Sequence, residues 1–429
     1  MCCDWRARLA DATPAPDRIA GLAAQARHAY GGGDLQAVAA ALIARLERDG
    51  QDAAAMLDLA YLFHARGQSE AGAALMDEAL RLRHDYRIVL GRGTGPRVLA
   101  LVAPGDLMAN TPLDFLLAGS DAVLHLHFVT PDDPLTDLPP HDVAMLAIGE
   151  APDRRALLRS LAPRLAAWPR PVVNAAADRI AGLTRDGVAR RLQGVPGLVC
   201  PPTLRLTRAG LAPLLLGAGP ETLHPGLDWP LILRPEGSHA GAGMERVGDA
   251  LHLADLLAET GTERFYLTRF VDYRGANGLF AKARVVLIDG RPYPVHLALS
   301  QDWIVHYLSA DMDTHADRRA AEAAWIAGFA DGFARRHAAA LAALADRIGL
   351  DYVGLDCAEL PDGRLLVFEV DVALIVHDMD DAARFPAKPP AMRQLFAAFQ
   401  ALLAAKAAGF PCRRGQLPHK SPESHYTPP

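Results

Sequence analysis

Two Asp-Gly dipeptides in the second half of the chain constrain its fold more than any other feature. Asp289-Gly290 and Asp362-Gly363 each lie between two runs that are rich in apolar residues. An Asp-Gly pair in this setting is the strongest short-range signal for a β-hairpin, because both central residues of its type I′ turn adopt positive φ angles. The sequence therefore predicts two antiparallel hairpins, whose strands cover residues 282–288, 291–299, 352–360 and 364–370.

The second hairpin gathers acidic residues on one face. A two-residue turn at Asp362-Gly363 places Asp356 directly opposite Glu369, and Asp371 follows on the same face because side chains alternate along a strand. Facing like charges, with Cβ atoms about 5 Å apart, destabilise a sheet. Oxygen ligands favour Mg²⁺ or Mn²⁺, with phosphate oxygens completing the coordination shell. We predict a metal site formed by Asp356, Glu369 and Asp371; the alternative is a solvated acidic face.

The first hairpin carries basic residues among apolar neighbours. Lys282 and Arg284 share one face of the strand 282–288. A charge on a buried strand needs a partner, which makes both residues candidates to bind phosphate. Arg284 is further suited to stabilise the charge that develops during phosphoryl transfer. The alternative is a salt bridge to a nearby acid.

The strand 291–299 and the residues after it are rich in polar aromatic groups. In an ideal register His296 lies opposite Ala283, on the face away from Arg284, so His296 reaches the phosphate site only if a β-bulge intervenes. An acceptor-substrate pocket and a set of hydrogen-bonded core histidines remain alternative interpretations. The candidates for the pocket are His296, Ser300, Trp303 and His306.

A glycine-rich segment follows a predicted strand at residues 230–235. Small residues allow backbone N–H groups to approach phosphates closely. No Gly-Lys-Ser/Thr sequence follows, so the segment is not a P-loop. It is either a nucleotide-binding loop or a surface turn. The candidate nucleotide ligands are Gly237, Ser238, His239, Gly241 and Gly243.

The first half of the chain has a different organisation. Residues 18–85 contain helical patterns only, and the segment 33–37 recurs at 67–71, which resembles the 34-residue period of tetratricopeptide repeats. These helices are either a docking surface for a peptide or protein partner or a cap on the next domain. Between residues 96 and 205 short apolar runs alternate with helical segments, which predicts a parallel sheet in an α/β domain.

Composition excludes several classes of protein. The net charge of −6 argues against a nucleic-acid-binding protein. No run of 18 apolar residues is present, so we expect no membrane-spanning helix. The five cysteines form no CxxC pair and are expected to be free thiols in a reducing cytoplasm. The segment 409–429 is polar and rich in proline, and we expect it to be disordered.

The order of these features resembles the ATP-grasp superfamily over about residues 96–405. The helical, tetratricopeptide-like region predicted above covers residues 1–92. The resemblance implies a small pre-ATP-grasp α/β domain at 96–205 and a two-lobed α+β ATP-grasp domain with antiparallel sheets at 206–408. It also implies that Mg-ATP binds between the two lobes. The expected enzyme is an ADP-forming carboxylate-amine ligase that acts on small-molecule or peptide substrates, and a homodimer is an expected state.

The resemblance also implies roles for single residues. Arg185 and Arg234 stand where the family usually has phosphate-binding lysines. Phe270 and Val271 match the hinge that receives adenine, and Asp272 matches an acid often used for ribose. Arg284 matches the catalytic arginine, and Asp356, Glu369 and Asp371 match the metal ligands, with Asp371 in place of the usual asparagine. Two alternatives remain, namely a kinase on the same scaffold and a non-catalytic nucleotide-binding or partner-binding protein.

Overall fold

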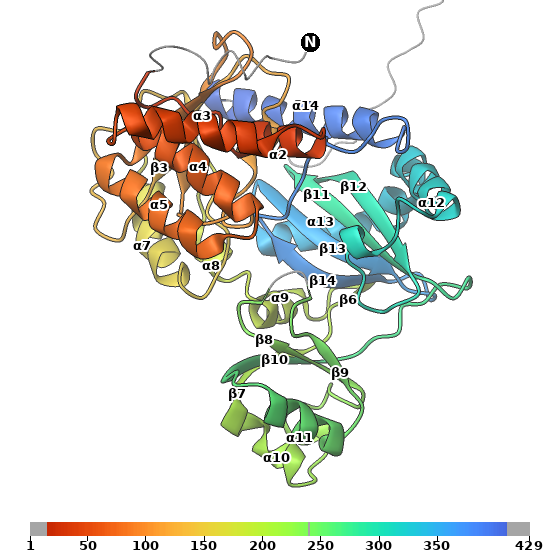
Figure 1. Cartoon of the computed structure of the whole chain (residues 1–429). Helices are drawn as coiled ribbons and strands as arrows, with labels where there is room; N and C mark the ends of the chain where they lie inside the picture. Colours follow the sequence, from red (N-terminus) through yellow and green to blue (C-terminus); the bar gives the residue numbers. More distant parts are fainter. Residues whose placement is uncertain (1–14, 239–240, 410–429) are drawn as a thin grey trace, which may run out of the picture.

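The computed structural model describes residues 15–238 and 241–409 of the chain (Figure 1). Two of the predictions concern residues outside these ranges: the nucleotide-ligand role of His239 and disorder in the segment after Gly409. None of the helices within the described ranges combines the length and the apolar character that a membrane crossing needs.

Four helices open the described chain: α2 (Leu22–Tyr30), α3 (Leu35–Arg48), α4 (Ala53–Ala65) and α5 (Ser69–Leu82). Asp34 and Asp52 cap α3 and α4 by accepting hydrogen bonds from backbone N–H groups of the first turn. The two copies of the repeated segment lie at the starts of α3 and α5. Helix α4 is buried along most of its length and joins the core of the following sheet. Partner binding by these helices remains a prediction.

A five-stranded sheet follows, with the order β1-β3-β2-β4-β5. Its strands are β1 (Asp85–Val89), β2 (Arg97–Val102), β3 (Val123–Phe128), β4 (Val143–Leu146) and β5 (Val172–Val173), and all except β1 run parallel. The connecting helices are α6 (Leu113–Leu116), α7 (Arg155–Ala166) and α8 (Ala177–Ala181). Alternate residues of β2 enter two different cores, because helices cover both faces of the sheet.

A small lobe extends from the rest of the molecule (Figure 1). Helix α9 (Arg185–Leu192) and strand β6 (Leu198–Val199) lead into its sheet, which has the order β7-β10-β8-β9. The strands are β7 (Thr203–Thr207), β8 (Leu231–Pro235), β9 (Glu245–Val247) and β10 (Arg264–Arg269), and the helices are α10 (Ala212–Leu215) and α11 (Ala250–Glu259). The lobe has a separate apolar core, which makes it a unit opposite the larger sheet described next.

The second five-stranded sheet has the order β12-β11-β13-β14-β6. It contains the two predicted hairpins, β11 (Phe280–Ile288) with β12 (Arg291–Ser300), and β13 (Tyr352–Glu359) with β14 (Leu365–Asp371). Between the two hairpins lie two helices, α12 (Ala316–Ala327) and α13 (Ala338–Ile348), separated by a π-helical turn at Ala330–Ala334. The mixture of parallel and antiparallel sheets agrees with the predicted α/β and α+β class.

Helix α14 (Lys388–Ala407) connects the two five-stranded sheets. Its apolar side chains belong to a single core that contains Val98 and Met145 of the parallel sheet and Val286 and Tyr352 of the second sheet. In Figure 1 the helix crosses the top of the molecule. The arrangement fixes the carboxyl ends of the parallel strands relative to the hairpin sheet, which positions the pocket described below.

Candidate functional site

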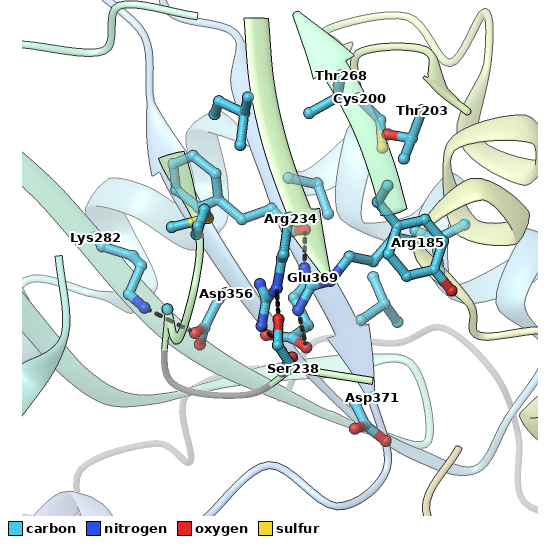
Figure 2. A pocket seen from close by; sticks show the side chains of 18 of the residues that line it. Arg185, Cys200, Thr203, Arg234, Ser238, Thr268, Lys282, Asp356, Glu369 and Asp371 are labelled. Atoms are coloured by element: carbon cyan, nitrogen blue, oxygen red, sulfur yellow. Dashed lines mark hydrogen bonds and ion pairs between the residues drawn. The ribbon is translucent and has the colours of Figure 1, made fainter. Parts of the chain in front are cut away.

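A cavity of about 280 Å³ lies between the small lobe and the hairpin sheet. Arg234 and Thr268 line it from the lobe, Arg284 and Asp356 line it from the hairpin sheet, and Glu150 lines it from the end of β4. Figure 2 shows basic and acidic side chains from both sides pointing toward one another across this space. The pocket is therefore formed by three separate parts of the fold.

A β-bulge in the first hairpin determines which residue faces Arg284. The turn has two residues, as predicted, and Asp289 and Gly290 both adopt positive φ angles. Val295 is an extra residue in β12, so that Arg284 pairs with His296 instead of Val295. The condition for His296 to join the phosphate-facing side is thus met, and the ideal register that placed it opposite Ala283 is wrong.

A second bulge lies at the same level of the other hairpin. Here the predicted two-residue turn is wrong: Glu359 pairs with Leu365, and Gly363 has a positive φ at the end of a longer turn. Phe368 is an extra residue in β14, and it restores the pairing of Asp356 with Glu369. The predicted facing pair is confirmed because the two deviations from the ideal hairpin cancel.

Together the bulges create one row of polar residues across four neighbouring strands. His296 on β12 pairs with Arg284 on β11, Arg284 pairs with Asp356 on β13, and Asp356 pairs with Glu369 on β14. Directly paired residues share a face of the sheet. We call these four residues the polar row. Bulges are common next to active sites, where they redirect side chains.

Asp356 is the most strongly paired member of the polar row. It is only 3% exposed, and its carboxylate accepts hydrogen bonds from Arg284 Nε at 2.8 Å and from Lys282 Nζ at 3.0 Å. Burial alone would raise the pKa of Asp356, but Arg284 and Lys282 outweigh it and hold the pKa well below its usual range. Arg284 also donates to the carbonyl oxygen of Ile375 at 3.0 Å, which fixes the guanidinium at the edge of the pocket.

The other two predicted metal ligands have different surroundings. Glu369 accepts a hydrogen bond from Arg185 Nη2 at 2.7 Å, visible in Figure 2. Asp371 accepts one from the backbone N–H of Ala373, and burial followed by the Glu369 charge raises the pKa of Asp371 to about 7. Among the residues that the structure describes, no three His, Cys, Asp or Glu side chains form a metal-binding group.

The glycine-rich loop begins directly after Arg234 at the end of β8. Arg234 is buried and donates from Nε to Ser238 Oγ at 3.0 Å. Burial and the nearby Arg185 lower the pKa of Arg234 to about 10. Gly237, Gly241 and Gly243 all have positive φ angles, which only glycine adopts without strain. Gly237, Ser238 and Gly241 line the cavity, so the loop lies over the basic residues of the site.

The predicted hinge is partly in the pocket. Phe270 and Val271 line the cavity, and the Phe270 ring contacts the edge of Trp303 with centroids 5.7 Å apart. Asp272 is not among the lining residues, and its carboxylate forms an ion pair with Arg274. This end of the cavity is mainly apolar, with Ile232 and Met244 contributing side chains from the lobe.

The four candidate substrate residues fall into two groups. Trp303 and His306 line the cavity. Ser300 is buried, and its hydroxyl accepts the backbone N–H of Asp302. His296 packs against the ring of Tyr307, with centroids 4.6 Å apart, and burial together with Arg284 and Lys388 lowers its pKa well below the usual range. His296 is therefore a neutral imidazole at neutral pH.

Glu150 and Arg155 are charged residues of the cavity that were not found from the sequence. Glu150 and Arg155 follow β4, Arg155 is paired with Glu150, and it also contacts Glu236 of the lobe at 2.7 Å. The sequence did contain a signal for them, because both residues follow a predicted parallel strand, and ligands in α/β sheets bind beyond the carboxyl ends of the strands. Arg155 thus links the parallel-sheet domain to the base of the glycine-rich loop.

No family model and no curated protein matches the chain. Solved structures that it resembles include an ATP-grasp protein with a RimK domain from Sphaerobacter thermophilus, at a TM-score of 0.42 and 17% identity, covering 72% of this chain and 99% of that one. D-alanine–D-alanine ligase from Bacillus anthracis resembles it in the ATP complex and in a second structure, both at a TM-score of 0.45 and 12% identity. Those matches cover 73% of this chain and 98% and 97% of the ligase chains.

Proposed function

We propose that the chain is an ATP- and Mg²⁺-dependent ligase of the ATP-grasp type, which forms an amide bond through an acylphosphate and releases ADP. The observation that supports this most is the polar row, of which Arg284, Asp356 and Glu369 line a pocket between two lobes opposite a glycine-rich loop. Several basic side chains converge there, among them those of Arg185, Arg234, Lys282 and Arg284. Such a site suits the anionic phosphates of a nucleotide.

The basic residues divide into anchors and a catalytic group. Arg185, Arg234 and Lys282 would hold phosphate oxygens together with backbone N–H groups of the loop at Gly237 and Ser238. Arg284 would stabilise the charge that builds up on the transferred phosphoryl group, because its guanidinium is held by Asp356 and by the Ile375 carbonyl. Preorganisation of this kind lowers the barrier, since little rearrangement is required during the reaction.

The carboxylates fit a divalent cation in their chemistry. Glu369 and Asp371 supply oxygen ligands from one face of β14, and burial followed by the nearby Glu369 charge raises the pKa of Asp371. Mg²⁺ or Mn²⁺ would be held by these two residues, with Asp356 as the third. A bound cation would neutralise phosphate charge and align the transfer.

The apolar end of the cavity suits the nucleotide base. Phe270, Val271 and Trp303 offer apolar surface there, and a ribose contact from Asp272 remains a prediction. At the opposite end, Glu150 and the residues after β14 surround space for the acid and the amine. His306 lies on the lining, whereas His296 and Ser300 are not among the lining residues. A small metabolite or a peptide end would serve as either substrate.

The test is ADP release with a panel of carboxylic acids and amines in the presence of Mg²⁺. A ligase releases ADP only when both substrates are present, and an amide product accumulates. Arg284→Ala should lower kcat about a hundredfold, with a change in the KM for ATP of threefold or less, because the guanidinium acts mainly on the transition state. Arg336→Ala is the matched control, since Arg336 pairs with Glu359 of the same sheet but is exposed and absent from the cavity lining.

Three results would contradict the proposal. Equal losses of ATP affinity and kcat in Arg284→Ala would make Arg284 a simple phosphate anchor. A phosphorylated hydroxyl as the final product would identify a kinase. ATP binding without turnover across the whole panel would support a nucleotide-binding protein without catalytic activity.

A further inference from the structure

A second polar cluster is buried behind the pocket, around Lys388 at the start of α14. Lys388 is only 4% exposed. Its Nζ lies 3.1 Å from Asp380 Oδ2, 3.5 Å from Glu322 Oε1 and 2.5 Å from the hydroxyl oxygen of Tyr307. We call these four residues the Lys388 cluster. One ammonium therefore serves two carboxylates and a phenol in a site with little access to water.

Lysine is a rare residue in this chain, and one of its few lysines is the cation of this cluster. The sequence has 44 basic residues, of which only Lys282, Lys388, Lys406 and Lys420 are lysines. Arginine is thus the usual cation in this protein. An ammonium is a compact point charge with three donors, whereas a guanidinium is a planar fork that needs more room. A site enclosed by three acceptors suits the smaller group.

The cluster joins segments that are far apart in the sequence. Tyr307 belongs to the segment 301–315 after β12, and Asp380 belongs to the segment 372–387 after β14. Glu322 lies on α12, where it accepts hydrogen bonds from the Tyr307 hydroxyl at 3.0 Å and from the backbone N–H of Leu297 at 3.1 Å. Lys388 itself begins α14. The ammonium is the common contact of these four elements.

Both joined segments form walls of the proposed active site. Trp303 and His306 come from the first, and Ala373, Leu374 and Ile375 come from the second. The Ile375 carbonyl accepts the hydrogen bond from Arg284. The Tyr307 ring packs on His296 of the polar row. Displacement of either segment would therefore move the surroundings of Arg284.

We propose that Lys388 is a positioning residue, which holds the segments 301–315 and 372–387 in place and thereby sets the orientation of Arg284 and the acceptor end of the pocket. The effect on catalysis rests on the proposed function, whereas the effect on the two segments does not. Without the ammonium, Glu322 and Asp380 would share a buried site with no cation between them. Loss of one partner from a buried ionic cluster is strongly destabilising.

Hydrogen–deuterium exchange tests the positioning directly. In Lys388→Met, backbone amides of 301–315 and 372–387 should exchange about a hundredfold faster than in the unmodified protein. The reason is that the free energy required to unfold these segments locally falls. Amides of the β7–β10 lobe should be unchanged. Lys406→Met is the control: Lys406 lies on the same helix and pairs with Asp351 at 3.0 Å, but it is 26% exposed and remote from the lining.

Tyr307→Phe provides a second variant if Lys388→Met does not fold. It removes only the hydroxyl that contacts Lys388 and Glu322, and it should accelerate exchange in the same two segments by about tenfold. The proposal is refuted if both segments exchange at the unmodified rate in the variant, or if the Lys406→Met control accelerates them equally.

Steady-state kinetics then separate positioning from a general loss of stability. Lys388→Met should lower kcat for amide formation about tenfold, with the KM for ATP changed by twofold or less, because the nucleotide anchors Arg185 and Arg234 are outside the cluster. An unchanged kcat would refute the catalytic part of the inference. Absence of turnover in the unmodified protein with every acid and amine would refute the proposed function, and the exchange data would still decide the role of Lys388.

Discussion

Replacement of Asp356 by asparagine tests the central ionic cluster of the pocket. Asp356 is buried between Arg284 and Lys282, and its carboxylate forms an ion pair with each of them. Asparagine keeps the size of the side chain but removes the negative charge. The two cations are then left close together without an anion, which should destabilise the protein and should at the same time free both groups for phosphate.

The magnitude follows from the burial of the partners. Loss of one member of a buried ion pair costs about 3–5 kcal/mol, and the lower end applies here because Arg284 and Lys282 keep side-chain exposures of 16% and 17%. The entropy of unfolding is about 2.1 cal/mol/K per residue, or roughly 0.9 kcal/mol/K for 429 residues. A loss of about 3 kcal/mol therefore lowers the Tm by roughly 3–4 °C.

The assay is thermal unfolding with and without ATP, in the absence of divalent metal. In the unmodified protein, the Asp356 carboxylate already neutralises Arg284 and Lys282, which weakens their attraction for phosphate. In Asp356→Asn the phosphates replace a missing anion, so ATP should raise the Tm of the variant more than it raises the Tm of the unmodified protein. Asp362→Asn is the matched control, because Asp362 pairs with Arg364 at the exposed tip of the same hairpin, where solvent screens the ion pair and its loss should leave the Tm nearly unchanged.

Two outcomes would refute this reasoning. A Tm of Asp356→Asn that equals that of the Asp362→Asn control would show that the buried pairs contribute little. An ATP-induced increase no larger than that of the unmodified protein would show that Asp356 does not compete with phosphate for Arg284 and Lys282.

Two further predictions concern Glu369 and His127. Glu369→Gln should reduce Mg²⁺-dependent ADP release about a hundredfold while the protein stays folded; unchanged turnover in a magnesium titration would remove Glu369 from the metal site. His127 lies between Asp85 and Asp133, with ring nitrogens 2.8 and 2.7 Å from their carboxylates. Burial lowers the His127 pKa, but the two acids outweigh burial and raise it. The stabilisation is therefore complete below the unfolded pKa of about 6.5 and is lost as the pH rises through the folded pKa. His127→Gln should flatten the dependence of the urea midpoint on pH above about 6.5; an unchanged slope would contradict this assignment.

Local patterns in the sequence predicted the hairpins well but not their irregularities. Asp289-Gly290 forms the expected two-residue turn, since both residues adopt positive φ angles. The turn at Asp362-Gly363 is longer, and only Gly363 has a positive φ. Turn length depends on one φ angle at the aspartate, and a bulge depends on packing from elsewhere in the fold. Pattern alone determines neither, and the correct pairing of Asp356 with Glu369 resulted from two deviations that cancel.

The candidate site was predictable where it depends on strand alternation. Asp356, Arg284 and Lys282 were expected on the pocket side of the sheet, and they lie there. That Asp356 binds both cations depends on the register between β11 and β13, strands separated by more than 60 residues. Strand β1 was missed although the buried Tyr86 and Ile88 alternate with Asp85 and Arg87, because the strand is short and follows directly after a helix.

The position of α14 has a consequence for synthesis of the protein. The cores of the parallel sheet and of the hairpin sheet both include side chains of this helix, which follows every strand that the structure describes. A nascent chain on the ribosome therefore exposes apolar residues of both sheets until α14 has been translated. Premature termination before Lys388 would leave two incomplete domains, and such a fragment would be a substrate for chaperones and proteases.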